Sequence, residues 1–517
     1  MIIGVGEASE RIDSAGYAAL SPVALAAAAA RAALQDAGPT GALAPAIEVV
    51  AAIRQFEISG PNAVAPFGRS NNFPRSVARR IGADPARAIL EVVGGQGPQH
   101  LVNELSQQIG RGELGLALIC GAEAISTVRA LTARGETRDW SDTQDGELED
   151  RGFGAAPMNS VEIAQAGART PIQVYALFEN ARRARLGLSR RDYALAMGEL
   201  FAPFTRVAAQ NPHAMAPEAL AAADLAEVTP RNRLVADPFP RRVVARDQAN
   251  QGAAVLIASA GRARALGVSE DRLVYLHGGA DVAERLPMQR ADLGAYPAAV
   301  FASRRALEIA GVGLADLACL DLYSCFPIAV FAVRDGLGIA PDDGRPLTLT
   351  GGLPFFGGAG NNYSMHAIAA MTRALRARPG AHGFVGANGG FLSKYSVGVY
   401  STRPSDWRGF DSAGLQAEID AWPAPALAPD AAAQGRVETY TVDYSRAAPQ
   451  GVLVCRTAAG ERFAAATDPD DEALVRKMIA EDPLGAEVAC RRDERGRRVA
   501  VSLAPTLDLT SRSQGRR

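Results

Sequence analysis

The sequence repeats itself, and this repeat limits the fold more than any other feature does. Residues 31–38 (RAALQDAG) have a counterpart in residues 304–311 (RRALEIAG), and a strand pattern follows each of them, at 47–53 and at 318–323. Self-similarity over a long spacing is the sequence signature of a duplicated structural unit. Strands that alternate with helices are typical of an α/β protein with a largely parallel sheet. We therefore predict two α/β halves of similar topology.

Each half also contains a glycine-rich turn that opens a helix. Residues 94–97 (GGQG) lead through a helix to a strand pattern at 116–120, and residues 357–360 (GGAG) lead to one at 383–386. Such turns leave backbone N–H groups unpaired at a helix N-terminus, where they bind a phosphate, a carboxylate or a developing oxyanion. Because the repeat relates the two turns, we expect them to face each other in one pocket. The alternative is that the glycines only permit close packing of helix on strand.

Reactive side chains lie near these turns in the sequence. Ligands of parallel sheets bind beyond the carboxyl ends of strands, and Tyr323 and Cys325 lie at and just beyond the end of the strand pattern 318–323. Tyr323 can donate a proton and Cys325 can act as a nucleophile, although such residues between apolar neighbours are also typical of core packing. His366, six residues after Gly360, either faces the pocket or is an ordinary helical histidine.

The candidate site residues therefore fall into two groups. The predicted catalytic residues are Tyr323, Cys325 and His366. The predicted substrate-binding residues are Gly95, Gly97, Gly357, Gly358, Gly360, Asn361 and Asn388. The five histidines show no ligand spacing, so no metal site is predicted.

Composition narrows the partners and the compartment. A net charge of −2 gives no basic excess for a nucleic-acid partner. The five cysteines are odd in number and include no CxxC pair, which favours a reducing compartment. No apolar run approaches the roughly 18 residues that a membrane span needs. We expect a cytoplasmic protein with no membrane partner.

The chain divides into regions of different character. We predict an N-terminal half at 1–260, with a loop insertion at about 124–240, and a C-terminal half at 261–405. A Pro/Ala-rich linker at 406–435 precedes a small β-rich domain at 436–510. The insertion carries an acidic loop and two long helical patterns; an insertion of this size usually caps a site, or else it covers a sheet edge.

Six segments of the chain resemble the thiolase superfamily, more narrowly its sterol-carrier-protein-X type. They lie in the family's order at 94–103, 118–123, 247–254, 321–327, 351–366 and 386–390. The C-terminal domain resembles the additional domain of thiolase-like proteins of type 1. The resemblance implies a duplicated five-layer α/β/α/β/α fold, acyltransferase activity of the acetyl-CoA acetyltransferase kind, a role in lipid metabolism and a coenzyme A thioester as substrate, without a cofactor. Thiolases generally dimerise through sheet edges of the first half, but an added domain can block that contact, so both a monomer and a homodimer are consistent with it.

The departures from the family matter as much as the resemblance. The family's nucleophilic cysteine corresponds to Gly95, and the histidine that activates it corresponds to Gly358. The asparagine of the NEAF motif corresponds to Tyr323, and the second cysteine falls near Ala387 or Asn388. Glycine provides neither a thiolate nor a base, so the resemblance implies a degenerate active site without ordinary thiolase turnover.

Three functions remain open at this point. The first is an acyl-CoA-binding enzyme of altered chemistry, such as a retro-aldol C–C lyase that uses Tyr323, because thiolase-like retro-aldolases use tyrosines near the NEAF position. The second is a non-catalytic protein that binds a coenzyme A thioester or serves as a scaffold. The third is a thiolase that recruits Cys325 as its nucleophile.

Overall fold

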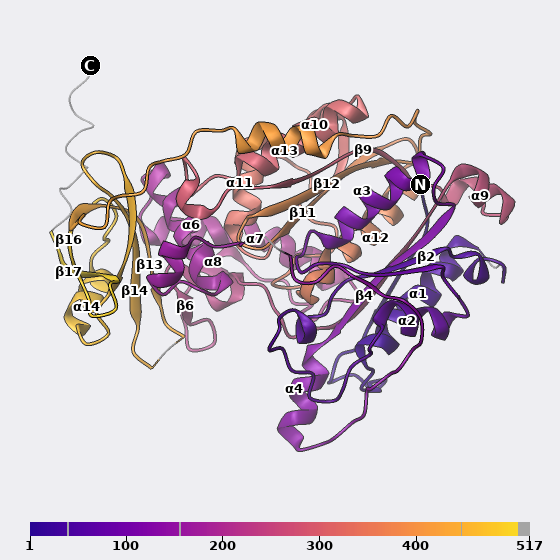
Figure 1. Ribbon diagram of the computed structural model, residues 1–517, viewed down its shortest axis with the longest axis horizontal. Helices are drawn as coiled ribbons and strands as arrows, with labels where there is room; N and C mark the ends of the chain where they lie inside the picture. The colour runs from indigo at the N-terminus through magenta and orange to yellow at the C-terminus, as the bar shows by residue number, and fades with distance from the viewer. Residues whose placement is uncertain (39–40, 155–156, 446, 505–517) are drawn as a thin grey trace.

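Two sheets form the body of the protein (Figure 1). The computed structural model describes residues 1–38, 41–154, 157–445 and 447–504. The first sheet has the order β1-β8-β4-β2-β3-β5 and the second has the order β10-β11-β12-β9. The strands of the first sheet are β1 (Ile2–Ser9), β2 (Val49–Ala52), β3 (Arg87–Leu90), β4 (Leu116–Ala124), β5 (Glu149–Asp150) and β8 (Asn250–Ala258). Those of the second are β9 (Tyr275–Ala283), β10 (Leu317–Leu322), β11 (His382–Gly389) and β12 (Lys394–Ser401).

The two sheets share one pattern of strand directions. In the first sheet β1 runs antiparallel to β8, β8 antiparallel to β4, and β4 parallel to β2. In the second sheet β9 runs antiparallel to β12, β12 antiparallel to β11, and β11 parallel to β10. The predicted duplication is therefore confirmed as a repeat of structure, with β2 and β10 as equivalent strands.

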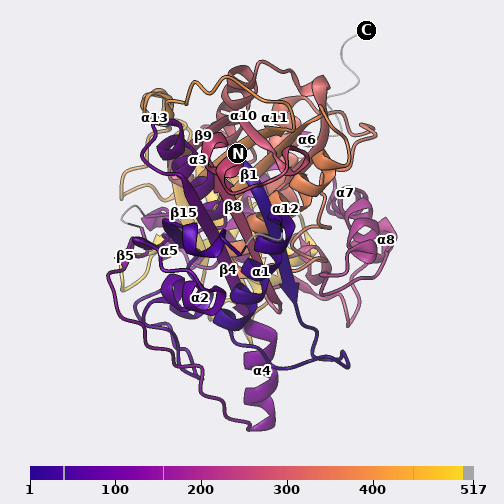
Figure 2. The ribbon, with the colours of Figure 1, turned by 90° about the vertical axis from the view of Figure 1, so that its right-hand side faces the viewer.

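Helices complete a five-layer α/β/α/β/α arrangement, as expected (Figures 1 and 2). One outer layer contains α1 (Pro22–Ala37) and α2 (Phe73–Ile81), and the other contains α10 (Pro297–Ala310) and α11 (Pro327–Leu337). The middle layer contains α3 (Gly97–Gly110) and α12 (Tyr363–Arg376), which pack between the inner faces of the sheets. These two helices are the ones that the glycine turns open.

The insertion both lies over the second half and closes a sheet edge. Its elements are α4 (Ile125–Arg134), β5, α5 (Val161–Gln165), α6 (Pro171–Leu186), α7 (Arg190–Gln210), α8 (Ala222–Ala226), β6 (Leu234–Ala236) and β7 (Phe239–Pro240). The predicted long helices correspond to α6 and α7. Strand β5 pairs in parallel with β3, with Ile89 opposite Glu149, and so covers the outer edge of the first sheet.

The C-terminal domain is a closed barrel with one helix. It consists of β13 (Gln434–Asp443), β14 (Gln450–Arg456), β15 (Arg462–Thr467), α14 (Glu472–Ala480), β16 (Glu487–Arg492) and β17 (Arg498–Leu503). The strand order is β14-β15-β17-β16-β13, and a β13–β14 pairing closes it; β15 and β17 are parallel. This order, with a helix between the third and fourth strands, is the topology of an OB-fold.

Several details of this region differ from the prediction. Arg462 in β15 and the adjacent Arg491 and Arg492 in β16 interrupt the apolar period of these two strands, so the sequence pattern does not reveal them individually. Helix α14 is capped by Asp471, whose side chain accepts a hydrogen bond from the N–H of Leu474. The expected linker contains helix α13 (Ser412–Asp420), whose Leu415 and Ile419 are buried. The expected end of the domain at residue 510 lies outside the described residues.

Two further short elements lie, along the chain, between the strands and helices already named. Helix α9 (Ala260–Ala265) follows β8, and a turn of 3-10 helix, η7 (Gly360–Asn362), precedes α12. Within the described ranges, no helix has the combination of length and hydropathy that a bilayer crossing requires.

Glycine contacts in the outer layers also follow the repeat. A Cβ atom on Gly4 of β1 would lie 2.3 Å from the carbonyl oxygen of Ala33 on α1. A Cβ atom on Gly278 of β9 would lie 2.1 Å from the carbonyl oxygen of Ala306 on α10. Ala33 and Ala306 occupy the same position in the repeated helices. Each outer helix therefore packs on its sheet at a distance that only glycine permits.

We predict that Gly4→Ala and Gly278→Ala destabilise the protein to a similar extent. The added methyl group forces helix and strand apart, which costs about 1–3 kcal/mol for an overpacked core. The midpoint of thermal unfolding should fall for both variants. Gly16→Ala is the control, because nothing lies within 4 Å of a Cβ atom at Gly16. Unchanged midpoints for the two core variants would contradict the close-packing argument.

Candidate active site

A cavity of about 930 Å³ opens where the two halves meet the insertion. Seven of the predicted site residues line it: Gly95, Tyr323, Cys325, Gly358, Gly360, Asn361 and Asn388. His366, Gly97 and Gly357 are not among its lining residues. The cavity therefore lies where the repeated glycine turns were expected to meet.

The two turns contact each other directly. The N–H of Gly94 donates a hydrogen bond to Oδ1 of Asn361 at 3.1 Å. The hydroxyl of Ser364, in the first turn of α12, donates to the carbonyl oxygen of Gly95. These bonds fix the start of α3 against the start of α12, so the inner wall of the cavity is built from both halves.

Tyr323 occupies the space beside Gly95. A Cβ atom built on Gly95 would lie 2.1 Å from the Tyr323 hydroxyl oxygen and 2.7 Å from the carbonyl oxygen of Asn388. The volume that a side chain at this position needs is therefore already filled. Among the described residues the Tyr323 hydroxyl has no hydrogen-bond partner, so it is available to a ligand in the cavity.

A second tyrosine, Tyr175 of α6, forms a small cluster with Asn388 and Cys325. The Asn388 side-chain amide donates to the Tyr175 hydroxyl at 2.8 Å and lies 3.8 Å from the Cys325 sulfur. The Tyr175 hydroxyl in turn donates to the carbonyl oxygen of Gly390 at 2.9 Å. The sequence analysis missed Tyr175, because it lies in the insertion, where neither the repeat nor a motif identifies it.

Burial keeps these side chains neutral. Desolvation raises the pKa of Cys325 to about 12 and raises the pKa of Tyr175 and of Tyr323 well above the usual tyrosine value. A thiol with such a pKa is a poor nucleophile near neutral pH, because the thiolate is the reactive form. The inner wall is therefore rich in neutral hydrogen-bond donors and has no activated nucleophile among these residues.

In the second glycine turn, two of the N–H groups that were expected to bind an anion have partners inside the protein. The N–H of Gly358 donates to the carbonyl oxygen of Arg246 at 2.7 Å, and the N–H of Gly360 donates to the carbonyl oxygen of Gly358 at 2.7 Å. Both donors are used inside the protein. At the first turn, by contrast, the N–H of Gly95 has no partner among the described residues and remains available.

The three predicted site residues that do not line the cavity, His366, Gly97 and Gly357, are packed inside the protein. The His366 side chain is fully buried and its Nδ1 lies 2.6 Å from a carboxylate oxygen of Glu7, which Arg373 also contacts. Burial opposes ionisation of Glu7, but the hydrogen bond and charge attraction of His366, together with the charges of Arg373 and His213, outweigh burial and lower the pKa of Glu7 to about 2. A Cβ atom on Gly357 would lie 2.5 Å from Oε1 of Gln251, and Gly97 packs against Ile53. The helical position of His366 could not reveal which way its ring points.

Arginines of the segment 231–246 line the outer part of the cavity. They are Arg231, Arg241, Arg242 and Arg246. Two acids also line the cavity, Glu218 and Asp247, and Asp247 is already paired with Arg129. Within the described ranges, Arg231, Arg241 and Arg246 form no ion pair. Guanidinium groups bind phosphate oxygens in a bidentate manner, so this mouth is suited to an anionic ligand group.

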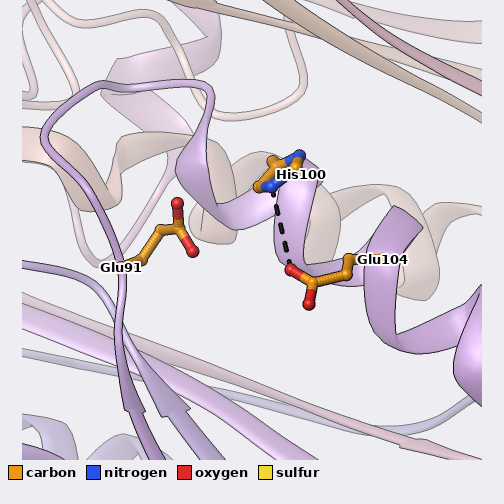
Figure 3. A group of neighbouring side chains, drawn as sticks. All are labelled: Glu91, His100 and Glu104. Carbon is orange, nitrogen blue, oxygen red and sulfur yellow. Dashed lines mark ion pairs between the residues drawn. The ribbon is translucent and has the colours of Figure 1, made fainter. Parts of the chain in front are cut away.

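One group of side chains has the composition of a metal site but is already neutralised. Glu91, His100 and Glu104 place ligand atoms within 4.8 Å of one another (Figure 3). Arg151 pairs with Glu91 at 2.7 Å and with Glu104 at 2.6 Å. Burial lowers the pKa of His100, but the hydrogen bond that its ring donates to Asp281 and the negative charges of Asp281, Glu91 and Glu104 together outweigh burial and raise the pKa to about 9. With both carboxylates paired to Arg151 and His100 paired to Asp281, the group forms an ion-pair network in this structure.

Comparisons with known proteins agree with this geometry. The family profile described as the thiolase-like protein type 1 additional C-terminal domain matches residues 414–495, and thus begins within helix α13. The crystal structure of a monomeric SCP2-thiolase-like protein type 1 from Mycobacterium smegmatis is 46% identical, with a TM-score of 0.82 over 97% of this chain and 98% of that chain. A search of the curated proteins found no match.

More distant solved structures share the fold alone. The Ltp2–ChsH2(DUF35) aldolase is 18% identical, with a TM-score of 0.56 over 77% of this chain and 97% of that chain. An acetyl-CoA acetyltransferase from Syntrophomonas wolfei is 15% identical, with a TM-score of 0.54 over 78% of this chain and 98% of that chain.

We predict that Gly95→Cys is not tolerated unless Tyr323 is also changed. The new side chain would overlap the tyrosine hydroxyl, at a cost of about 1–3 kcal/mol. The thermal midpoint of Gly95→Cys should fall, and the double variant Gly95→Cys with Tyr323→Ala should recover part of the loss. Tyr323→Ala alone is the control. Additive effects of the two substitutions would show that the residues do not compete for this space.

Proposed function

Because the chain belongs to the SCP2-thiolase-like protein type 1 family, we propose that its cavity binds an acyl-CoA thioester without forming an acyl-cysteine. This proposal rests on one observation: the same cavity has an inner wall and a mouth of different chemical character. An inner wall of neutral donors and apolar groups leads to a mouth with four arginines. A thioester of coenzyme A has the same two parts, an acyl-pantetheine arm and a group of phosphates.

The inner wall offers two donors to the thioester carbonyl. The N–H of Gly95 and the hydroxyl of Tyr323 are both without partners among the described residues and lie side by side. Apolar side chains around them suit an acyl group: Met158, Ile172, Phe326, Leu353, Phe355 and Phe391. Arg241 and Arg246 at the mouth would meet the phosphates.

Covalent thiolase chemistry is not part of the proposal. The position of the family's cysteine is Gly95, whose side-chain space Tyr323 fills. Cys325 is the remaining thiol at the cavity, and its pKa of about 12 leaves about one molecule in 10⁵ as thiolate at pH 7. This argues against the third function considered above, a thiolase that uses Cys325.

We predict that calorimetry detects binding of coenzyme A and of acetyl-CoA, and that Arg241→Gln with Arg246→Gln weakens it at least about tenfold. Hydrogen bonds between charged groups contribute about 1.5–3 kcal/mol each, and the loss should shrink at high salt. Arg436→Gln is the matched control, since Arg436 lies on the barrel and pairs with Glu487 at the surface.

Two results would contradict this function. Wild-type protein that fails to bind coenzyme A at millimolar concentration would exclude it. An acyl adduct in the intact mass after incubation with acetyl-CoA would show covalent chemistry instead, and the Cys325→Ser variant would then identify the sulfur involved.

A second candidate function, a retro-aldol lyase on a β-hydroxyacyl-CoA, is favoured by the free Tyr323 hydroxyl. Such a reaction breaks the Cα–Cβ bond, transfers the hydroxyl proton to a base and forms a carbonyl compound and the enolate of the shorter thioester. The enolate then takes a proton at its α-carbon. Tyr323 and the Gly95 N–H would donate hydrogen bonds to the enolate oxygen as its charge develops. The Ltp2–ChsH2(DUF35) aldolase shares the fold, which is compatible with this chemistry.

If the lyase function is right, Tyr323→Phe should lower the cleavage rate of a β-hydroxyacyl-CoA by about 10²-fold or more, because it removes one oxyanion donor. Affinity for coenzyme A should change little. Tyr395→Phe is the control, since the Tyr395 hydroxyl is buried, unpartnered in the described structure and away from the cavity. Binding without any cleavage by the wild type would leave a non-catalytic thioester-binding protein as the function.

A further inference from the structure

The face of the C-terminal barrel that OB-folds use for ligands is buried inside this protein. OB-folds bind ligands on the face formed around their second and third strands, which are β14 and β15 here. Val452, Val454 and Ala464 on these strands belong to one hydrophobic cluster with Ile163 and Tyr175 of the insertion. The alternate residues of the same strands point into the barrel and form its own core. The face therefore serves as an internal interface.

Strand β13 of the barrel holds the start of helix α6. Gln173, in the first turn of α6, accepts a hydrogen bond from the N–H of Thr170 at 2.9 Å and donates one to Asp443 of β13 at 2.6 Å. One turn later, the Thr439 hydroxyl of β13 donates to the carbonyl oxygen of Leu177 at 2.5 Å. Thr170 and Tyr175 of this helix start line the cavity. The barrel thus fixes one wall of the cavity.

The same strand holds the segment that carries the arginines. The N–H of Asp237 donates to the carbonyl oxygen of Val442 at 2.9 Å, and the N–H of Tyr444 donates to that of Val235 at 3.2 Å. The Tyr440 hydroxyl donates to a carboxylate oxygen of Asp237 at 3.0 Å. Strands β6 and β7 thereby extend the barrel sheet and end directly before Arg241. These hydrogen bonds fix a second wall of the cavity, the mouth that carries the arginines.

A buried arginine of β15 is hydrogen-bonded to residues that support a third wall of the cavity. The Arg462 guanidinium is fully buried and donates to the carbonyl oxygens of Met288 at 3.0 Å and Arg290 at 2.6 Å. The side chain of Arg290 then donates to the carbonyl oxygen of Phe391 at 2.9 Å, and Phe391 lines the cavity. Glu438 of β13 pairs with Arg462 at 2.7 Å and balances its charge.

From these three contacts we infer that the C-terminal barrel is the positioning element of the cavity. It holds helix α6, the arginine segment and the Phe391 loop in one arrangement. Thr439 and Arg462 of the barrel, and Gln173 of α6, are the positioning residues. The barrel binds no ligand on its second and third strands. Its predicted effect on affinity rests on the proposed thioester binding, whereas its effect on the cavity walls does not.

The test compares two threonine substitutions within the barrel. Thr439→Val keeps the side-chain shape but removes the donor to Leu177. Thr457→Val is the matched control, because the hydrogen bonds that the described residues make with Thr457 stay within its own hairpin, to Gly460 and Glu461. Hydrogen–deuterium exchange of residues 170–178 and 234–246 should quicken by about fivefold or more in Thr439→Val, as expected for a buried bond lost, and should stay unchanged in Thr457→Val. Thr439→Ser, which keeps the hydroxyl, should restore slow exchange.

Affinity for coenzyme A provides the second measurement. It should weaken about fivefold or more in Thr439→Val and recover in Thr439→Ser. Faster exchange confined to the barrel, with residues 170–178 and 234–246 unchanged, would overturn the inference. If wild-type protein binds no coenzyme A, the proposed function fails, but the exchange result still decides the role of the barrel. Should Thr439→Val not fold, Gln173→Leu breaks the contact from the α6 side and carries the same expectations.

Discussion

The contact between two helix starts in the middle layer determines the site. Helices α3 and α12 lie between the sheets, and their glycine turns approach closely because glycine stands at the points of contact. Gly121 of β4 is one such point: its carbonyl oxygen accepts a hydrogen bond from Asn362 at 2.8 Å, and a Cβ atom there would lie 2.4 Å from the same side chain. The second half thus rests on a strand of the first. The position of the cavity, the exposure of the Gly95 N–H and the place of Tyr323 all follow from this approach.

Much of the fold could be predicted from the sequence, because short sequence patterns that occur in both halves reveal the duplication. Repeated helices, glycine turns and strands carry their own periodicity. The repeat itself sets Gly95 opposite Gly358, and the resemblance assigns them the places of the family's cysteine and histidine. The site was less predictable where distant segments decide it. The carbonyl oxygen of Arg246 takes up the Gly358 N–H, and no local pattern signals such a long-range bond. Tyr175 and Arg231 come from the insertion, which has no counterpart in the repeat, and the other arginines of the mouth follow directly after it. A basic cluster in 231–246 was nonetheless visible in the sequence and could have been weighed.

The reactions that this cavity can support are limited by the loss of the family's cysteine and histidine. A thiolate with a histidine base can form and break an acyl bond, whereas a neutral tyrosine hydroxyl beside a free N–H can only polarise a carbonyl group or stabilise its enolate. Desolvation reinforces this limit, because it keeps Tyr323 and Cys325 protonated. The surrounding walls are nevertheless tied together by buried polar contacts from three directions. These contacts fix the walls in the arrangement on which the proposed binding of a thioester depends.

The short strand β5 has a consequence for how the protein behaves at high concentration. An uncovered edge strand is a template on which another chain can add through backbone hydrogen bonds, and such addition leads to aggregation. On β3 this template is taken up by residues 149 and 150 of the same chain. Both are acidic, and Glu149 is half exposed beside Arg87 and Arg151. A second copy approaching the same edge would meet identical carboxylates and would have to displace β5 first. These two residues thereby keep the first sheet of the protein from growing at the edge of β3.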